Sequence, residues 1–140
     1  MMSEQVDAQA FYVLAAEAAH NVNNQLRIAL GEEPKPAWKD LPAEFRAGVI
    51  QGVENVVKGV TPRESQAGWV RHKQETGWVY GPVEDAVKKT HPAMLPYDEL
   101  PEWTKRKDVI FIAVVEAVLI KYGCHLRTAY EKIALEHIVP

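Results

Sequence analysis

The sequence is poor in cysteine, in net charge and in long apolar segments, and each shortage excludes a class of protein. Its one cysteine, Cys124, rules out an internal disulfide and any zinc site built from several cysteines, and it fits a reducing compartment. The net charge of −3, with both signs intermixed, lacks the basic surface that binding to DNA or RNA requires. No apolar run reaches membrane-spanning length. We therefore expect a cytoplasmic protein whose partners include neither a nucleic acid nor a membrane.

Motifs of catalysis are also missing. The sequence has no glycine-rich phosphate loop, no His-Glu-x-x-His zinc motif and no Gly-x-Ser-x-Gly nucleophile motif. Cys124 and His125 are adjacent, and neighbours in sequence do not face each other on a helix, so they do not suggest a nucleophile with its base. His72 and Glu75 share one helix face and could hold a metal together with His91, but such a pair is more often an exposed polar face. We expect no catalytic centre, no metal and no cofactor.

The sequence does contain enough apolar residues, 47%, to build one buried core. Apolar residues recur at helical spacing in several segments, which predicts one mainly α domain with helical extensions. The predicted helices cover residues 7–30, 42–58, 62–75, 108–119 and 126–138. Thr61 and Glu64 form a capping box that opens the third helix. The first helix ends at Gly31, and the two prolines in residues 32–36 predict a semi-rigid linker, so the first helix could be an appendage.

The sequence also predicts which face the first helix buries and what lies between the third and fourth helices. The first helix carries one apolar face, the kind that a helix turns toward a core, made of Phe11, Leu14, Ala18, Val22 and Leu26. Residues 77–82 are aromatic and β-branched, but glycine interrupts them, so we predict a tight extended turn rather than a sheet of its own. One short helical turn is expected at 85–89. Coil punctuated by proline should follow through residue 97.

Residues 108–119 are nearly continuously apolar, which predicts a helix buried on most sides. This much apolar surface requires an additional contact. The candidates are the final segment at 126–138, the first helix or a second subunit. We therefore expect a homo-oligomer.

A set of residues occurs in an order that is specific to one family. The set is Trp69, Lys73, Gly77-Trp78-Val79-Tyr80-Gly81, Asp85, Lys89, His91-Pro92, Pro96-Tyr97, Leu100, Lys107 and Asp108. Over roughly residues 42–118 the sequence resembles the ryanodine receptor repeat (RyR domain), in the single-copy form found in bacteria and phages. Two stretches depart from the family pattern, Gln66-Ala67-Gly68 and Ala93-Met94. These departures bear on the ligand more than on the fold.

The resemblance implies a small helical module with a short β-like turn and no catalytic centre. It also implies binding of a small nucleotide-derived ligand, as in a phage protein that sequesters an immune signal in the host cytoplasm. We accordingly predict an N-terminal helix at 1–33, an RyR-type repeat domain at 34–122 and a C-terminal helix at 123–140. An alternative is a module for protein interaction or assembly, with the apolar helix as its dimer face.

The predicted ligand-binding residues form an aromatic and basic cluster. They are Trp69, Lys73, Trp78, Tyr80, Lys89, His91 and Tyr97. Flat rings can stack on a base, while ammonium and imidazole groups can neutralise a phosphate. The same residues can instead build a core with a basic rim. We assign Trp69 and Trp78 mainly to the core and leave Lys73, Tyr80, Lys89 and His91 open between the two roles.

Overall fold

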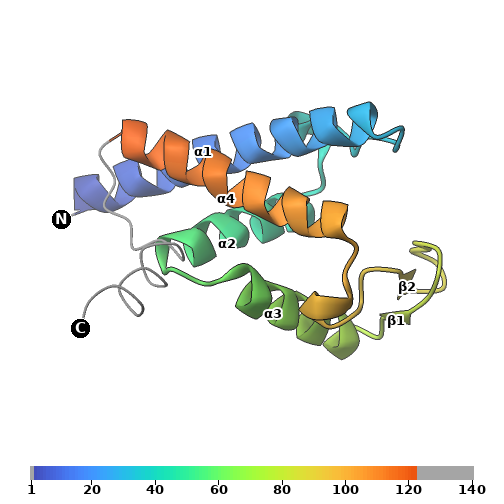
Figure 1. Cartoon of the computed structure of the whole chain (residues 1–140). Coiled ribbons are helices and arrows are strands. Elements are labelled where there is room, and N and C mark those ends of the chain that lie inside the picture. Colours follow the sequence, from blue (N-terminus) through green and yellow to red (C-terminus); the bar gives the residue numbers. More distant parts are fainter. Residues whose placement is uncertain (1, 123–140) are drawn as a thin grey trace, which may run out of the picture.

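The computed structural model describes residues 2–122, and Figure 1 shows their arrangement. In chain order, its elements are α1 (Met2–Ala29), η1 (Trp38–Asp40), α2 (Ala43–Val57), α3 (Pro62–Glu75), β1 (Val79–Tyr80), β2 (Thr90–His91), η2 (Tyr97–Glu99) and α4 (Glu102–Lys121). The mainly α fold is confirmed. The helix predicted at 123–140 lies outside the described residues.

The first helix is part of the core rather than an appendage. Ala15, Ala16 and Ala19 of α1 are fully buried in the same cluster as Val115 and Leu119 of α4. The two helices lie side by side in Figure 1 and run antiparallel, with α2 packed against both. Alanine side chains allow close approach of the helix axes, because the interaxial distance depends on side-chain size at the contact.

The face that α1 buries is only partly the one predicted, since Phe11 packs against the core. Leu14 and Val22 are 45% and 39% exposed, whereas the alanines and His20 are buried. His20 belongs there because its Nε2 donates a hydrogen bond to the carbonyl oxygen of Pro36 at 2.8 Å. The prediction weighted large apolar side chains, and α1 instead turns its small residues to the core.

Helix α3 begins as predicted. The hydroxyl of Thr61 accepts from the amide of Glu64 at 3.2 Å, and the Glu64 carboxylate accepts from the amide of Thr61 at 3.3 Å, so the capping box is confirmed. The helix ends before Gly77, whose φ of 90° lets the chain turn away toward β1.

The aromatic segment after α3 forms a short parallel pair, with Val79 opposite Thr90 and Tyr80 opposite His91. We had predicted coil at 90–97, and this pairing was missed because two residues on each side give too weak a pattern. The pair needs Gly81, since an added Cβ would lie 2.6 Å from the Thr90 Cβ.

The connection between the strands forms a turn at 86–89 without helical structure, whereas we predicted one short helical turn at 85–89. The Asp85 carboxylate accepts from the amides of Val87 and Lys88 at 2.9 and 3.0 Å, and this local bonding replaces helical hydrogen bonds.

Helix α4 is covered on fewer sides than its composition predicted. Val115 and Leu119 are fully buried, but Val109 and Ile120 are 55% and 62% exposed on another face. The buried face of α4 packs against α1, so the first helix is one of the additional contacts that we expected for this apolar segment. Within the described part of the chain, none of the helices is both long and apolar enough to cross a membrane.

Candidate functional site

A cavity of about 770 Å³ opens beside the first half of α4. Its walls come from the end of α1, the linker at 32–36, α3, the loop after β2 and the start of α4. The uncharged lining side chains include Asn23, Gln66, Trp69, His91, Trp103 and Thr104. The charged ones are Arg27, Glu32, Glu33, Lys35, Glu84, Lys107 and Asp108.

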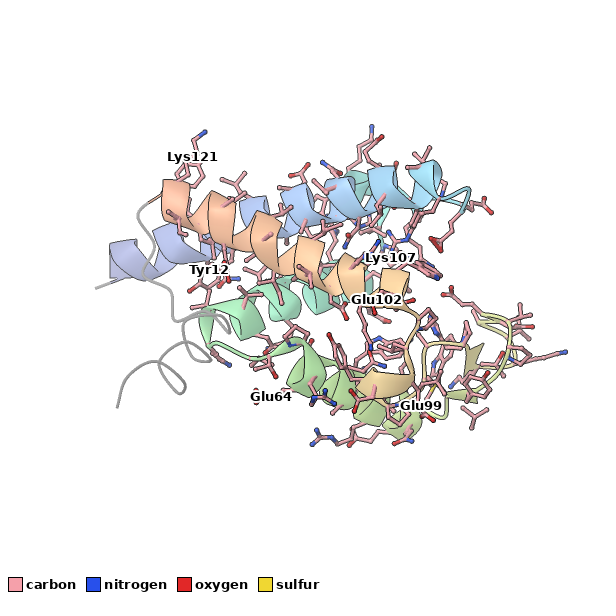
Figure 2. All side chains as sticks on the ribbon, in the orientation of Figure 1. Tyr12, Glu64, Glu99, Glu102, Lys107 and Lys121 are labelled. Carbon is pink, nitrogen blue, oxygen red and sulfur yellow. The ribbon has the colours of Figure 1, made fainter. Side chains whose placement is uncertain are left out.

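Two ion pairs hold the linker across this cavity. Both oxygens of Glu32 accept hydrogen bonds from the Lys107 ammonium, at 3.1 and 2.9 Å. Farther along, the Lys35 ammonium donates to Glu84 at 3.1 Å. Figure 2 shows Lys107 on the first half of α4, on the side that faces the end of α1. The segment predicted as a linker is thus a wall of the site.

The backbone of the linker is also fixed to α1. The Asn24 amide nitrogen donates to the carbonyl oxygen of Lys35 at 2.9 Å, and the Asn24 oxygen accepts from the amide of Lys35 at 3.0 Å. This reciprocal pair holds the backbone in a defined position although prolines exclude regular structure there.

His91 presents a single proton donor toward the cavity. Its Nδ1 accepts from the amide of Ala93 at 3.0 Å, so the neutral ring carries its proton on Nε2. That nitrogen lies 3.8 Å from a carboxylate oxygen of Glu84. Burial lowers the pKa of His91, and the opposing effect of Glu84 is smaller. At neutral pH the ring therefore offers a hydrogen bond rather than a positive charge.

Four of the seven predicted residues meet beside this cavity. The Trp69 ring lines it and lies edge-on to the His91 ring, with centroids 4.9 Å apart. Behind them, the Lys73 ammonium lies 4.0 Å from the centroid of Trp78 and 5.8 Å from that of Trp69. Burial lowers the pKa of Lys73. Trp69 and His91 thus line the cavity, while Lys73 and Trp78 support them.

Lys89 and Tyr80 lie away from the cavity lining. The Lys89 ammonium donates to the carbonyl oxygen of Thr76 at 2.9 Å, where it satisfies a free acceptor at the end of α3. Its φ of 55° is in the left-handed region. Tyr80 is 55% exposed. The structure gives Lys89 a helix-capping contact.

Tyr97 belongs to a separate cluster. Its ring lies 5.0 Å from the guanidinium carbon of Arg63 and 5.1 Å from the ammonium of Lys105. Arg63 donates to both oxygens of Asp98, at 2.9 and 2.8 Å. These contacts join α3 to η2, outside the cavity lining.

The sequence interpretation missed several lining residues. One of them is Trp103, and the Lys107 ammonium lies 4.2 Å from the centroid of its ring. Gln66 donates to the carbonyl oxygens of Ala93 and Leu95 at 2.8 and 2.9 Å, which fixes the loop after His91 to α3. Lys107 belongs to the family pattern and Gln66 to a stretch that departs from it, so a signal existed for both, although no role was assigned to them.

Asp108 is the most perturbed carboxyl of the site. Burial raises its pKa to about 6, against the smaller opposing effect of Lys107. The structure shows no hydrogen bond or ion pair for this side chain with the other described residues. In residues 2–122, no three His, Cys, Asp or Glu side chains gather as metal ligands would.

These features define a helical module with a cavity on one side, and the linker at 32–36, held by two ion pairs, forms one wall of that cavity. Residues 51–128 match the RyR domain family, which is more than half of the chain. The chain therefore belongs to the RyR domain family. The match starts within α2, so α1 and the linker, which supply one wall of the cavity, precede it.

Proposed function

We propose that this protein binds a small anionic, nucleotide-derived ligand in the cavity and does not transform it. The observation that carries the proposal is the cavity itself, which measures about 770 Å³ and is lined by aromatic side chains and by charged side chains of both signs. Sites for small molecules typically measure about 300–1,000 Å³ and combine apolar walls with a few polar groups. The cavity has the size of such a site, and its walls combine indole rings with polar groups from the RyR domain and from the preceding α1 and linker.

The chemistry of the lining suits a nucleotide. Trp69 and Trp103 are flat rings of the kind on which a base stacks. The neutral His91 ring offers its Nε2 proton to an acceptor. Arg27 supplies a guanidinium group, which matches the geometry of phosphate oxygens. Glu32 and Glu84 are each occupied by a lysine, which favours a structural role for these two carboxylates over acid–base chemistry.

A module of this kind can act by sequestration. A phage protein that holds a host immune signal in the host cytoplasm requires tight and reversible binding without turnover. We extend the proposal to this role, which depends on the ligand being a signalling nucleotide.

Calorimetric titration tests the proposal directly. We expect at least one member of a panel of cyclic dinucleotides, ADP-ribose derivatives and adenine nucleotides to bind in a saturable manner, and chromatography to recover it unchanged after incubation. A panel that gives no heat at high protein concentration refutes ligand binding. Conversion of the bound nucleotide refutes the non-catalytic part and indicates an enzyme.

One observation favours a second function, homo-oligomeric assembly. Val109 and Ile120 are exposed on α4, and Ala113 and Ala117 between them are exposed as well. Their spacing places all four on one helix face. A second copy of the chain that covers this face would make α4 the dimer helix.

A further inference from the structure

Four of the seven charged side chains that line the cavity form two ion pairs. Lys107 is held by Glu32, and Lys35 by Glu84. Of the three basic side chains in the lining, only Arg27 forms no ion pair with another residue of the described part. An anion that enters the cavity therefore meets one cation that is not already paired.

Arg27 retains most of its hydrogen-bonding capacity. It lies in the last turn of α1 and is half-buried, and its Nη1 donates to the side-chain oxygen of Asn24 at 3.0 Å. A guanidinium has five N–H donors, so several remain for a ligand. Burial lowers the pKa of Arg27, while Glu32 and Glu84 act in the opposite direction. The group is partly removed from water, and a half-buried charge gains more from an anionic partner than an exposed one.

We propose that Arg27 is the residue that receives the anionic group of the ligand, a phosphoryl or carboxylate group held by the guanidinium fork. This inference rests on the proposed function of the cavity. It places the primary recognition residue in α1, before residues 51–128 that match the family. Residues 51–128 alone would then lack the contact with the anion.

The lysines are weaker candidates for the same task. The charge of Lys107 is already compensated by Glu32, and that of Lys35 by Glu84. An anion at either ammonium would lie next to that carboxylate and be repelled by it. Arg27 has no carboxylate within ion-pair distance among the described residues.

Asp108 provides a contrast within the same cavity. It is a carboxyl group with no ion pair among the described residues, and above its pKa it adds a negative charge to the lining. Removing it should favour an anion, whereas removing Arg27 should oppose one. Opposite effects of two substitutions in one cavity cannot come from a general loss of structure.

Pyrophosphate is a suitable probe because it carries only the anionic part of a nucleotide. We would titrate it into the full chain at neutral pH and constant ionic strength and follow binding by calorimetry and by tryptophan fluorescence, since Trp69 and Trp103 line the cavity. Arg27→Gln should weaken binding about tenfold or more, because a hydrogen-bonded charge is lost. Arg27→Lys keeps the charge without the fork and should weaken it about threefold.

Two further variants serve as controls. Arg71→Gln removes the same charge from an exposed position of α3 outside the cavity and should stay within about twofold of the unchanged chain. Asp108→Asn should bind pyrophosphate about threefold more tightly. Circular dichroism checks that each variant is folded, and Arg27→Lys carries the test if Arg27→Gln is not.

Four results would overturn the assignment of Arg27. These are unchanged binding by Arg27→Gln, equal losses in Arg27→Gln and Arg71→Gln, a loss in Asp108→Asn as large as that in Arg27→Gln, and no saturable binding of pyrophosphate to the unchanged chain. None of these decides the proposed function, because the nucleotide panel measures that separately. A nucleotide that binds equally well to Arg27→Gln would leave the cavity as the site and place its anion elsewhere.

Discussion

Glu32, just after α1, accepts hydrogen bonds at both carboxylate oxygens from Lys107 of α4, at 3.1 and 2.9 Å. The side chains are 35% and 17% exposed, so this pair is more shielded from water than Lys35 and Glu84, at 43% and 50%. Both pairs hold the linker that walls the cavity. Because their burial differs, the two pairs should contribute differently to stability.

Breaking the Glu32–Lys107 pair should destabilise the fold more than breaking the outer pair. We expect Glu32→Gln to lower the free energy of unfolding by about 1–2 kcal/mol, between the values typical of exposed and buried pairs. Lys35→Gln, the matched change in the exposed pair, should cost about 0.5 kcal/mol. Urea denaturation measures both.

A double-mutant cycle with Glu32→Gln and Lys107→Gln separates the pair from its surroundings. We expect a coupling energy of about 1 kcal/mol. A coupling indistinguishable from zero would show that the linker is held by its backbone contacts with Asn24 instead.

Asp108 should make stability depend on pH. Because its folded pKa is raised to about 6 from 3.8, its protonated form is favoured in the folded chain. Its contribution to stability is fully present below its unfolded pKa and is lost as the pH rises through about 6. Asp108→Asn removes this dependence. The free energy of unfolding of the variant, relative to that of the unchanged chain, should therefore rise by roughly 2–3 kcal/mol between about pH 4 and pH 7.

The measurement is the difference between the two unfolding free energies across this pH range, which cancels the titration of all other groups. A constant difference would mean that the Asp108 carboxyl is as well solvated in the folded chain as in the unfolded one. The cavity would then be wetter at this point than its lining indicates.

The exposed face of α4 predicts association. We expect light scattering to show a dimer or larger assembly at micromolar concentration, and Ile120→Lys to dissociate it, because a charge buried in an apolar contact is costly. Val87→Lys is a matched control, since Val87 is 94% exposed in the turn between the strands. A monomeric unchanged chain would contradict the assembly hypothesis, as would equal effects of the two substitutions.

Local patterns predicted the local parts of this fold. The capping box at Thr61 and the apolar spacing gave α2 and α3 nearly to the residue, because both signals lie within a few positions. The buried face of α1 was predicted only in part, because small alanines give less signal than Leu14 and Val22. No pattern within α1 or the linker shows which distant helix covers them.

The candidate site was predicted only in part for the same reason. The family pattern located Trp69 and His91, which line the cavity. Arg27 and Glu32 were missed because the cavity that they line is completed by segments far along the chain. The Glu32–Lys107 pair joins residues separated by 75 positions, and neither residue alone suggests the other.

The structure separates two residues that the sequence grouped together, His91 and Lys89. His91 lines the cavity, whereas Lys89 caps the end of α3 through Thr76. For a nucleotide of the panel that binds, His91→Ala should weaken affinity by about five- to tenfold, the value of one neutral hydrogen bond. Lys89→Ala should leave that affinity within about twofold and lower stability by less than about 1 kcal/mol. Calorimetry and thermal melting give the two quantities. A loss of affinity in Lys89→Ala equal to that in His91→Ala would return Lys89 to the binding surface, and would show that the ligand extends from the cavity across the strand pair.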